Sequence, residues 1–395
     1  RKLNVGAVLE GGVRKADQKV RITAQLVNTV TGYQLWSQTF DRDLGDILSL
    51  QTEIAAHVAS ALRVVLLGQE TQRLTDGGTE NPEAFDYFLR ARKAYREDLE
   101  QDSLQSARSL FDHAIDSDPE YALAWAHRAE VLALLAAYWS GNDTQERDEL
   151  QRLALASANR AIEIAPTSGQ AYASLATVLS FAGLDFIAIE AAYRRGIHFE
   201  PGNASLLLDY ARLAADLGRP EALATASRAV TLNPLNPTAH SGKGGVLLYL
   251  RRFDEARAAF DEALRLRDDG IARNWRGVVE IASGRPAAAL PYCEKDKHAW
   301  FGQYCLAIAY QQLGRTSEAA AMLKQLHSEN GDSLAYQYAQ IHAQWGRKAE
   351  ALKWLATAAE LRDSGLSDVK VDPLLDPIRK DPAFGRIVTS LGFPE

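Results

Sequence analysis

A helix-pair motif that recurs about every 34 residues constrains this 395-residue chain more than any other feature. Four segments end alike, FDHAIDSDP, ANRAIEIAP, YRRGIHFEP and ASRAVTLNP, and their prolines lie 47, 35 and 33 residues apart: Pro119, Pro166, Pro201 and Pro234. A second series marks the turn inside each pair: Gly183, Gly218, Gly284, Gly314 and Gly346. Glycine permits a left-handed turn and proline ends a helix, so the pattern predicts helical hairpins that stack because none buries its apolar face alone.

The hairpin pattern resembles the tetratricopeptide repeat, with about eight units over residues 84–363, some of them degenerate. The third unit carries most of the family's positions: Tyr172, Leu175, Ala176, Leu179, Gly183, Tyr193, Gly196 and Pro201. The resemblance implies a mainly α fold, an α-solenoid, in which the first helix of each unit lines a concave surface. In that family the concave surface binds a protein or peptide segment.

Counting in phase along the first helices gives the candidate partner-binding residues of that surface. They are Gln170, Thr177, Ser205, Arg212, Asp216, Ser241, Asn274, Trp275, Tyr304, Gln311, Tyr336 and Gln340. This mixture of polar and aromatic side chains suits an extended protein segment. The alternative is a solvated groove without a specific ligand.

Residues 1–67 have a different period. Alternating apolar and polar residues predict three strands up to about residue 40, and a helical period follows from Asp46. This small α/β domain resembles the second half of the TolB-amino-terminal-like domain, on motifs that include Leu9-Glu10-Gly11, Val13-Arg14, Leu35-Trp36, Asp41-Arg42 and Gln51-Thr52-Glu53-Ile54. In that family a further strand and helix come first, so the first strand here is expected to lack a neighbour. Residues 68–83 are polar and glycine-containing, which predicts a linker.

Three local features allow more than one interpretation. Gly242, Gly244 and Gly245 lie in one first helix, and they indicate either close helix packing, which we favour, or a deepened groove. The 41–43 Asp-Arg-Asp cluster is either a latch or, as we favour, a charge cluster at a helix start. Residues 364–395 are expected to form a C-terminal cap over the last repeat, with Phe384, Ile387, Val388 and Leu391 on the apolar face of a short helix.

The sequence shows few signs of a catalytic or metal-binding site. The sequence contains no phosphate-binding loop, nucleophile elbow or zinc-protease motif. Cys293, His298 and Cys305 are close in sequence but lack the spacing and fourth ligand of a zinc site. The two cysteines are either buried thiols or a disulfide between adjacent helices. We therefore expect no catalytic residue, no metal and no cofactor, and hence no enzyme activity in this chain.

Composition limits the partners further. A net charge of −7 gives no basic footprint for direct nucleic-acid binding, and no apolar run is long enough to span a membrane. The two cysteines and the lack of a targeting segment favour the cytoplasm; a spanning helix before Arg1 would instead place the array in the periplasm. A homo-oligomer stays open.

The resemblances together imply the regulatory part of a bacterial signalling protein. In the TolB-like family an effector domain comes first, such as a winged-helix DNA-binding domain of the CadC type, a class III adenylate or guanylate cyclase, or a protein kinase. The function expected here is therefore a non-enzymatic protein-interaction and regulatory module for signal transduction or transcription regulation. It would bind a partner or its own effector domain. The alternatives are the regulatory tail of an enzyme and a stand-alone scaffold.

Overall fold

The computed structural model describes residues 7–16, 19–29, 33–43, 50, 53–54, 57–58, 77–97, 100–140, 144–183 and 185–394. They divide into two compact units, which we treat separately. Unit 1 comprises residues 1–132 and 152–174, and unit 2 comprises residues 133–151 and 175–395.

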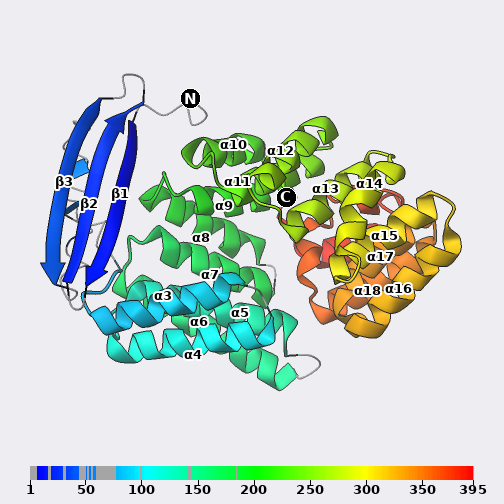
Figure 1. Ribbon diagram of the computed structural model, residues 1–395. Coiled ribbons are helices and arrows are strands. Elements are labelled where there is room, and N and C mark those ends of the chain that lie inside the picture. The colour runs from blue at the N-terminus through cyan, green and yellow to red at the C-terminus, as the bar shows by residue number, and fades with distance from the viewer. Residues whose placement is uncertain are drawn as a thin grey trace. The chain divides into compact units, whose positions relative to one another are not determined.

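Unit 1 begins with an antiparallel sheet of order β1-β2-β3, whose strands are Ala7–Ala16, Lys19–Asn28 and Gln34–Asp43 (Figure 1). The alternation predicted for the second strand is present, because Val20, Ala24 and Leu26 are buried while Arg21 and Thr23 are exposed. Trp36 is half-buried and stacks on His57 with ring centroids 6.0 Å apart. The predicted helix and linker fall largely outside the described residues.

The expectation for the Asp41-Arg42-Asp43 cluster was wrong. All three residues belong to β3 rather than to a helix start. Arg21 of the neighbouring strand donates to Asp41 at 2.6 Å, since the two residues are directly opposed in the sheet. Arg42 pairs with Glu53 at 2.8 Å. These side chains therefore form cross-strand and local ion pairs, while most of the linker that a latch would contact lies outside the described residues.

The rest of the described chain is helical, and helices α3 to α18 follow one another in pairs (Figure 1). Their bounds are α3 Pro82–Glu97, α4 Gln101–Ser117, α5 Ala122–Tyr138, α6 Thr144–Ile164, α7 Gly169–Ala182, α8 Phe186–Phe199, α9 Ala204–Asp216, α10 Ala222–Leu232, α11 Pro237–Tyr249, α12 Phe253–Leu266, α13 Gly270–Ala282, α14 Pro286–Cys293, α15 Trp300–Gln312, α16 Thr316–Asn330, α17 Ala335–Gln344 and α18 Lys348–Leu361. The solenoid of helical hairpins predicted from the repeat, with a small three-stranded sheet before it, is thus confirmed. The four series prolines each lie two residues beyond the end of a second helix.

The turns inside the pairs explain four of the five glycines in the series, whereas Gly183 does not have a positive φ. Gly218, Gly284, Gly314 and Gly346 have φ between 68° and 76°, the left-handed region. Arg251, which lies 33 residues from both Gly218 and Gly284, occupies the same turn with φ 57°. Its backbone N–H donates to the carbonyl of Leu248, as Gly218 donates to that of Ala215. A non-glycine residue in this conformation costs about 1 kcal/mol or more.

Two of the three glycines of α11, Gly242 and Gly244, serve close packing, as favoured from the sequence, and Gly245 does not. A methyl group at Gly244 would lie 2.8 Å from ring atoms of the fully buried Phe260, whereas one at Gly245 would meet nothing within 4 Å. The interpretation as a deepened groove is therefore not needed for Gly244.

Gly244→Ala is expected to destabilise the protein by about 1–3 kcal/mol, because Phe260 must leave its rotamer to admit the methyl group. Gly245→Ala is the matched control on the same helix. It should be neutral or stabilise by up to about 1 kcal/mol through helix propensity. Urea midpoints measure both, and equal midpoints for the two variants would contradict the packing argument.

After α18 the chain turns back rather than leaving the array. Two short 3₁₀ turns, η4 (Ser364–Asp368) and η5 (Pro373–Leu375), precede helix α19 (Pro382–Ser390). Phe384 of α19 is buried in one apolar cluster with Leu355 of α18, and Ile387, Val388 and Leu391 pack against that cluster. This part covers the last hairpin as a cap would. Among the residues placed here, no helix combines the length and apolarity required to cross a bilayer.

Candidate functional site

The twelve predicted residues all lie on first helices of the pairs. Gln170 and Thr177 are on α7, Ser205, Arg212 and Asp216 on α9, Ser241 on α11, Asn274 and Trp275 on α13, Tyr304 and Gln311 on α15, and Tyr336 and Gln340 on α17. We call the side of unit 2 formed by α9, α11, α13, α15 and α17 the groove face. Residues 363–379, here called the C-terminal segment, contact it.

Asp368 of the C-terminal segment is the first point of contact. Tyr249, the last residue of α11, donates its hydroxyl to Asp368 Oδ2 at 2.5 Å. Arg212 of α9 places Nη2 3.7 Å from Asp368 Oδ1. The carboxyl of Asp216, one turn along α9, lies beside the same group and is only 2% exposed. Since 65% of the Arg212 side chain stays exposed, this part of the groove face is open to water.

Asp372 is the second point of contact and is almost completely buried. It accepts hydrogen bonds from the Tyr336 hydroxyl at 2.8 Å, from the Gln340 amide, and from the backbone N–H of Leu374 at 2.8 Å. Burial raises its pKa to about 6, although these hydrogen bonds favour the charged form. The site therefore holds Asp372 more firmly when it carries a proton.

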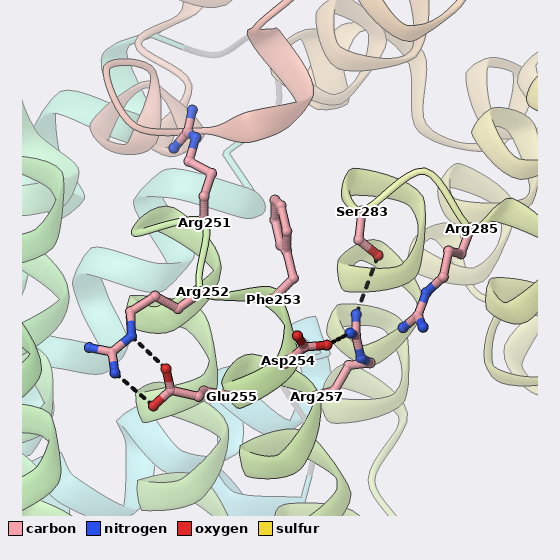
Figure 2. A pocket seen from close by; sticks show the side chains of 8 residues that line it. All are labelled: Arg251, Arg252, Phe253, Asp254, Glu255, Arg257, Ser283 and Arg285. Atoms are coloured by element: carbon pink, nitrogen blue, oxygen red, sulfur yellow. Dashed lines mark hydrogen bonds and ion pairs between the residues drawn. The ribbon is translucent and has the colours of Figure 1, made fainter.

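Arg251 makes the third contact from the turn after α11. Its guanidinium donates to the carbonyl of Val371 and, at 2.7 Å, to Asp376 Oδ1. Figure 2 shows the side chain extending toward the ribbon of the C-terminal segment, away from the other labelled residues. Gln344 of α17 adds a donor to the carbonyl of Leu374 at 2.7 Å.

Electrostatically, the contact places the carboxyl groups of Asp216 and Asp368 beside the guanidinium of Arg212. Burial, and then the neighbouring Asp368, raise the pKa of Asp216 well above its ordinary value. Asp368 in turn raises the pKa of the Arg212 guanidinium. With Asp216 and Asp368 beside Arg212, full ionisation would leave an excess of negative charge in the cluster.

The C-terminal segment reaches only some of the predicted residues. Arg212, Asp216, Tyr336 and Gln340 lie at it, and Asp372 is near enough to Tyr304 to contribute, after burial, to the raised pKa of that hydroxyl. Gln170 instead belongs to unit 1. There it donates to the buried carboxylate of Glu130 at 2.9 Å, which also accepts from Ser174.

The other predicted residues form a sparser set on the groove face. Trp275 meets Tyr249 edge-on, with ring centroids 6.5 Å apart. Asp216 Oδ1, Asn274 Oδ1 and Gln311 Oε1 are acceptors without a hydrogen-bond partner in the part of the chain that is described. Ser241 is half-buried and Ser205 is exposed, and the half-buried Thr177 of α7 lies outside the groove face. Whether these side chains bind a partner stays a prediction.

Sequence reasoning missed Tyr249, Arg251 and the C-terminal segment itself. Tyr249 falls outside the counted positions, because it ends its helix. The sequence does contain a signal for Arg251. The unit between Gly218 and Gly284 has no glycine at the turn position, and Arg251 occupies that position. The segment was expected to act only as a cap, since no local pattern shows contacts between residues more than a hundred positions apart.

A pocket of about 380 Å³ lies next to this contact. It is lined by Arg251, Arg252, Phe253, Asp254, Glu255, Arg257, Ser283 and Arg285 (Figure 2). Four arginines would suggest an anion site, but each already has a carboxylate partner. Arg252 binds Glu255 through two hydrogen bonds of 2.7 Å, Arg257 binds Asp254, and Arg285 binds Glu280 at 2.6 Å. The pocket is a set of local ion pairs.

The two cysteines are joined to each other. Cys293 and Cys305, both buried, form a disulfide with Cα atoms 5.7 Å apart, which selects one of the alternatives left open above. Across the described ranges, no group of three or more His, Cys, Asp or Glu side chains is arranged to hold a metal ion.

Comparison with known proteins identifies the repeat. The tetratricopeptide repeat family matches residues 220–267 and 242–298. A curated protein from Rhizobium meliloti (strain 1021), named putative adenylate cyclase 3, is 34% identical over 183 residues. That match covers 46% of this chain and 30% of the relative, so the chain spans less than a third of the relative's length.

Two solved structures are among those that match this chain. YrrB, described as a tetratricopeptide protein with an unusual peptide-binding site, is 20% identical and matches 46% of this chain and 97% of its own, with a TM-score of 0.30. Yeast Tom70 is 16% identical and matches 79% of this chain and 68% of its own, with a TM-score of 0.47.

Proposed function

We propose that this chain is a non-enzymatic interaction and regulatory module of a bacterial signalling protein. It binds a partner segment, or an effector domain of its own protein, on the groove face. The TolB-like resemblance of residues 1–67 and the named relative support a signalling context. The effector class that they favour is a nucleotide cyclase, ahead of a DNA-binding domain or a kinase.

One observation carries the proposal: the groove face already binds a segment that lies outside the helices of the repeats. Side chains from α9, α11 and α17 bind carboxylates and carbonyls of residues 363–379, in addition to the apolar packing of this segment on the last hairpin. A surface that binds one such segment has the donors that a second would need. Buried aromatic residues beside polar donors are also typical of interaction surfaces.

Partner capture with the full chain as bait tests the proposal. Trp275→Ala removes an aromatic ring from the groove face, and Trp300→Ala removes one from the exposed start of α15. We expect a bound protein to be retained by the wild type and by Trp300→Ala, and lost with Trp275→Ala. Equal retention by both variants would overturn the assignment to the groove face.

A second experiment addresses regulation of an effector. In the full-length protein, Trp275→Ala should change the output of the effector domain while Trp300→Ala leaves it unchanged, because a regulatory module must bind the two effector states differently. Unchanged output with both variants would instead favour a scaffold.

A further inference from the structure

The C-terminal segment departs from the rule that a repeat contacts only its neighbours. Tyr249 and Asp368 are 119 residues apart in sequence, and Arg251 and Asp376 are 125 apart. Helices α9 and α17, which the segment connects, are separated by three complete hairpins, α11/α12, α13/α14 and α15/α16. The segment therefore links repeats that the solenoid itself does not bring into direct contact.

Its two sides differ in chemistry. Leu366, Val369, Leu375 and Ile378 are buried in the apolar cluster of the last hairpin. The carboxylates of Asp368 and Asp376 and the carbonyl of Val371 face the other way, toward α9 and α11. The apolar side keeps the segment on α17 and α18, whereas the side facing α9 and α11 is held by polar contacts. Beyond the segment, Phe393 stacks on the buried Phe186 of α8 with ring centroids 4.2 Å apart.

Arg251 shows that this contact influences the backbone. Each of the four glycine turns compared above uses glycine where this turn has an arginine with φ 57°. The residue retains a strained conformation, and its guanidinium binds the C-terminal segment. The contact supplies a physical reason for an arginine at this position.

We propose that the C-terminal segment is a releasable clasp, which holds α9 and α11 against the last hairpin and must open before a partner segment can occupy the same part of the groove face. The clasp proposal rests on the proposed function only for the statement that a partner segment occupies the groove face after opening. The opening itself is a property of the chain alone. A partner that fits the released site carries carboxylates, because Arg212, Tyr249 and Arg251 bind carboxylates in the closed state.

Charge makes the clasp sensitive to pH. The charged and titratable groups at the contact are Arg212 and Asp216 of α9, Tyr249 and Arg251 of the α11 end, Tyr138 at the end of α5, Tyr304 of α15, Tyr336 of α17, and Asp363, Asp368, Lys370, Asp372, Asp376 and Arg379 of the segment. The pKa of Asp216 is raised in the closed state, so the closed state binds a proton that the open state releases. Rising pH therefore favours opening.

Distance measurement between spin labels on the full chain tests the clasp. Labels at Leu232→Cys on α10 and Lys353→Cys on α18 report the spacing of the clasped hairpins; both positions are exposed, and the native cysteines are joined to each other. At pH 5 the wild type should give one narrow distance. Asp368→Ala should add a second population with longer and more broadly distributed label distances. The ratio of open to closed molecules should be at least about tenfold higher in this variant than in the wild type, as expected for loss of a buried charged hydrogen bond.

A second variant guards against misfolding. Arg251→Gly relaxes the strained turn while removing the contacts to Val371 and Asp376, so it should open the clasp severalfold without weakening the hairpin. Asp332→Ala, on an exposed turn before α17, is the control and should leave the distances unchanged. In the wild type, a shift from pH 5 to pH 8 should increase the longer population.

Identical distance distributions in the wild type, Asp368→Ala and Arg251→Gly would overturn the clasp. That result leaves the proposed function intact, because partner capture is scored separately through Trp275. Conversely, a clasp that opens as expected in a chain that captures no partner would reject the proposed function and retain the clasp.

Discussion

Between pH 4 and pH 7 the C-terminal part of unit 2 is expected to lose about 3 kcal/mol of stability through Asp372 alone. Burial raises the pKa of this carboxyl to about 6 in the folded protein, against an ordinary value of 3.8. A difference of about two units corresponds to about 3 kcal/mol between the protonation states.

The sign follows from which state holds the proton. Between pH 3.8 and about 6 the folded state keeps the Asp372 proton and the unfolded chain has lost it. Stability from this group is therefore present at low pH, falls as the pH rises through that window, and is constant above it.

Comparison with Asp372→Asn isolates the effect. The asparagine stays neutral at every pH. Any stability that the variant loses through altered hydrogen bonds is therefore the same at every pH and does not affect the pH dependence of the difference from the wild type. The variant should gain about 3 kcal/mol relative to the wild type between pH 4 and pH 7, measured as the free energy of opening by hydrogen exchange in α17 and α18. A difference that stays flat over this range would show that Asp372 ionises without penalty.

Glu190→Gln serves as a control of opposite sign. Burial alone would raise the pKa of Glu190, but hydrogen bonds from Arg219 and Arg194 outweigh it and the pKa is lowered. The ionised Glu190 therefore stabilises the folded state at pH values above the ordinary pKa of a glutamate, and this stabilisation is lost as the pH falls. The glutamine variant should lose stability relative to the wild type at pH 7 and recover part of it at low pH.

The sequence allowed the repeat architecture to be predicted because the signals are local and periodic. Proline after each second helix, small residues between helices and glycine in the turns act within one unit, so a single chain shows them several times. The same periodicity placed all twelve candidate residues on first helices. The interpretation of the α11 glycines as packing positions is confirmed for Gly242, which faces Leu208, and for Gly244, which faces Phe260, but not for Gly245.

The clasp could not be predicted in the same way. Its contacts join Arg212, Tyr249 and Arg251 to a segment more than a hundred residues later, and no period connects these positions. The prediction that residues 41–43 mark a helix start was wrong for a related reason. Arg21 and Asp41 pair because strands β2 and β3 are in register, and the register depends on the whole sheet rather than on the local charge pattern.

Phe384→Ala is expected to have the largest effect of the substitutions considered, about 3–5 kcal/mol against the packing of the last hairpin. Phe384 is buried against Leu355, Leu375 and Ile378, and its removal leaves a cavity at the end of the array. A terminal repeat has a neighbour on one side only, so the loss is not shared along the solenoid. Hydrogen exchange should show α17 and α18 opening locally. The exposed Leu250→Ala should change stability by less than about 0.5 kcal/mol.

Which helices lose exchange protection in Phe384→Ala distinguishes the role of the C-terminus as a cap on the last hairpin from its role as a clasp on α9 and α11. If α19 only caps the last hairpin, α9 and α11 should keep their exchange protection. Because Asp372 is held by Tyr336 and Gln340 of α17, opening of that hairpin should also release the clasp and lower protection at α9 and α11. Asp368→Ala should affect α9 and α11 while sparing α18, since the apolar anchors remain. An Asp368→Ala variant that opens α18 as strongly as Phe384→Ala would show that cap and clasp are one cooperative element.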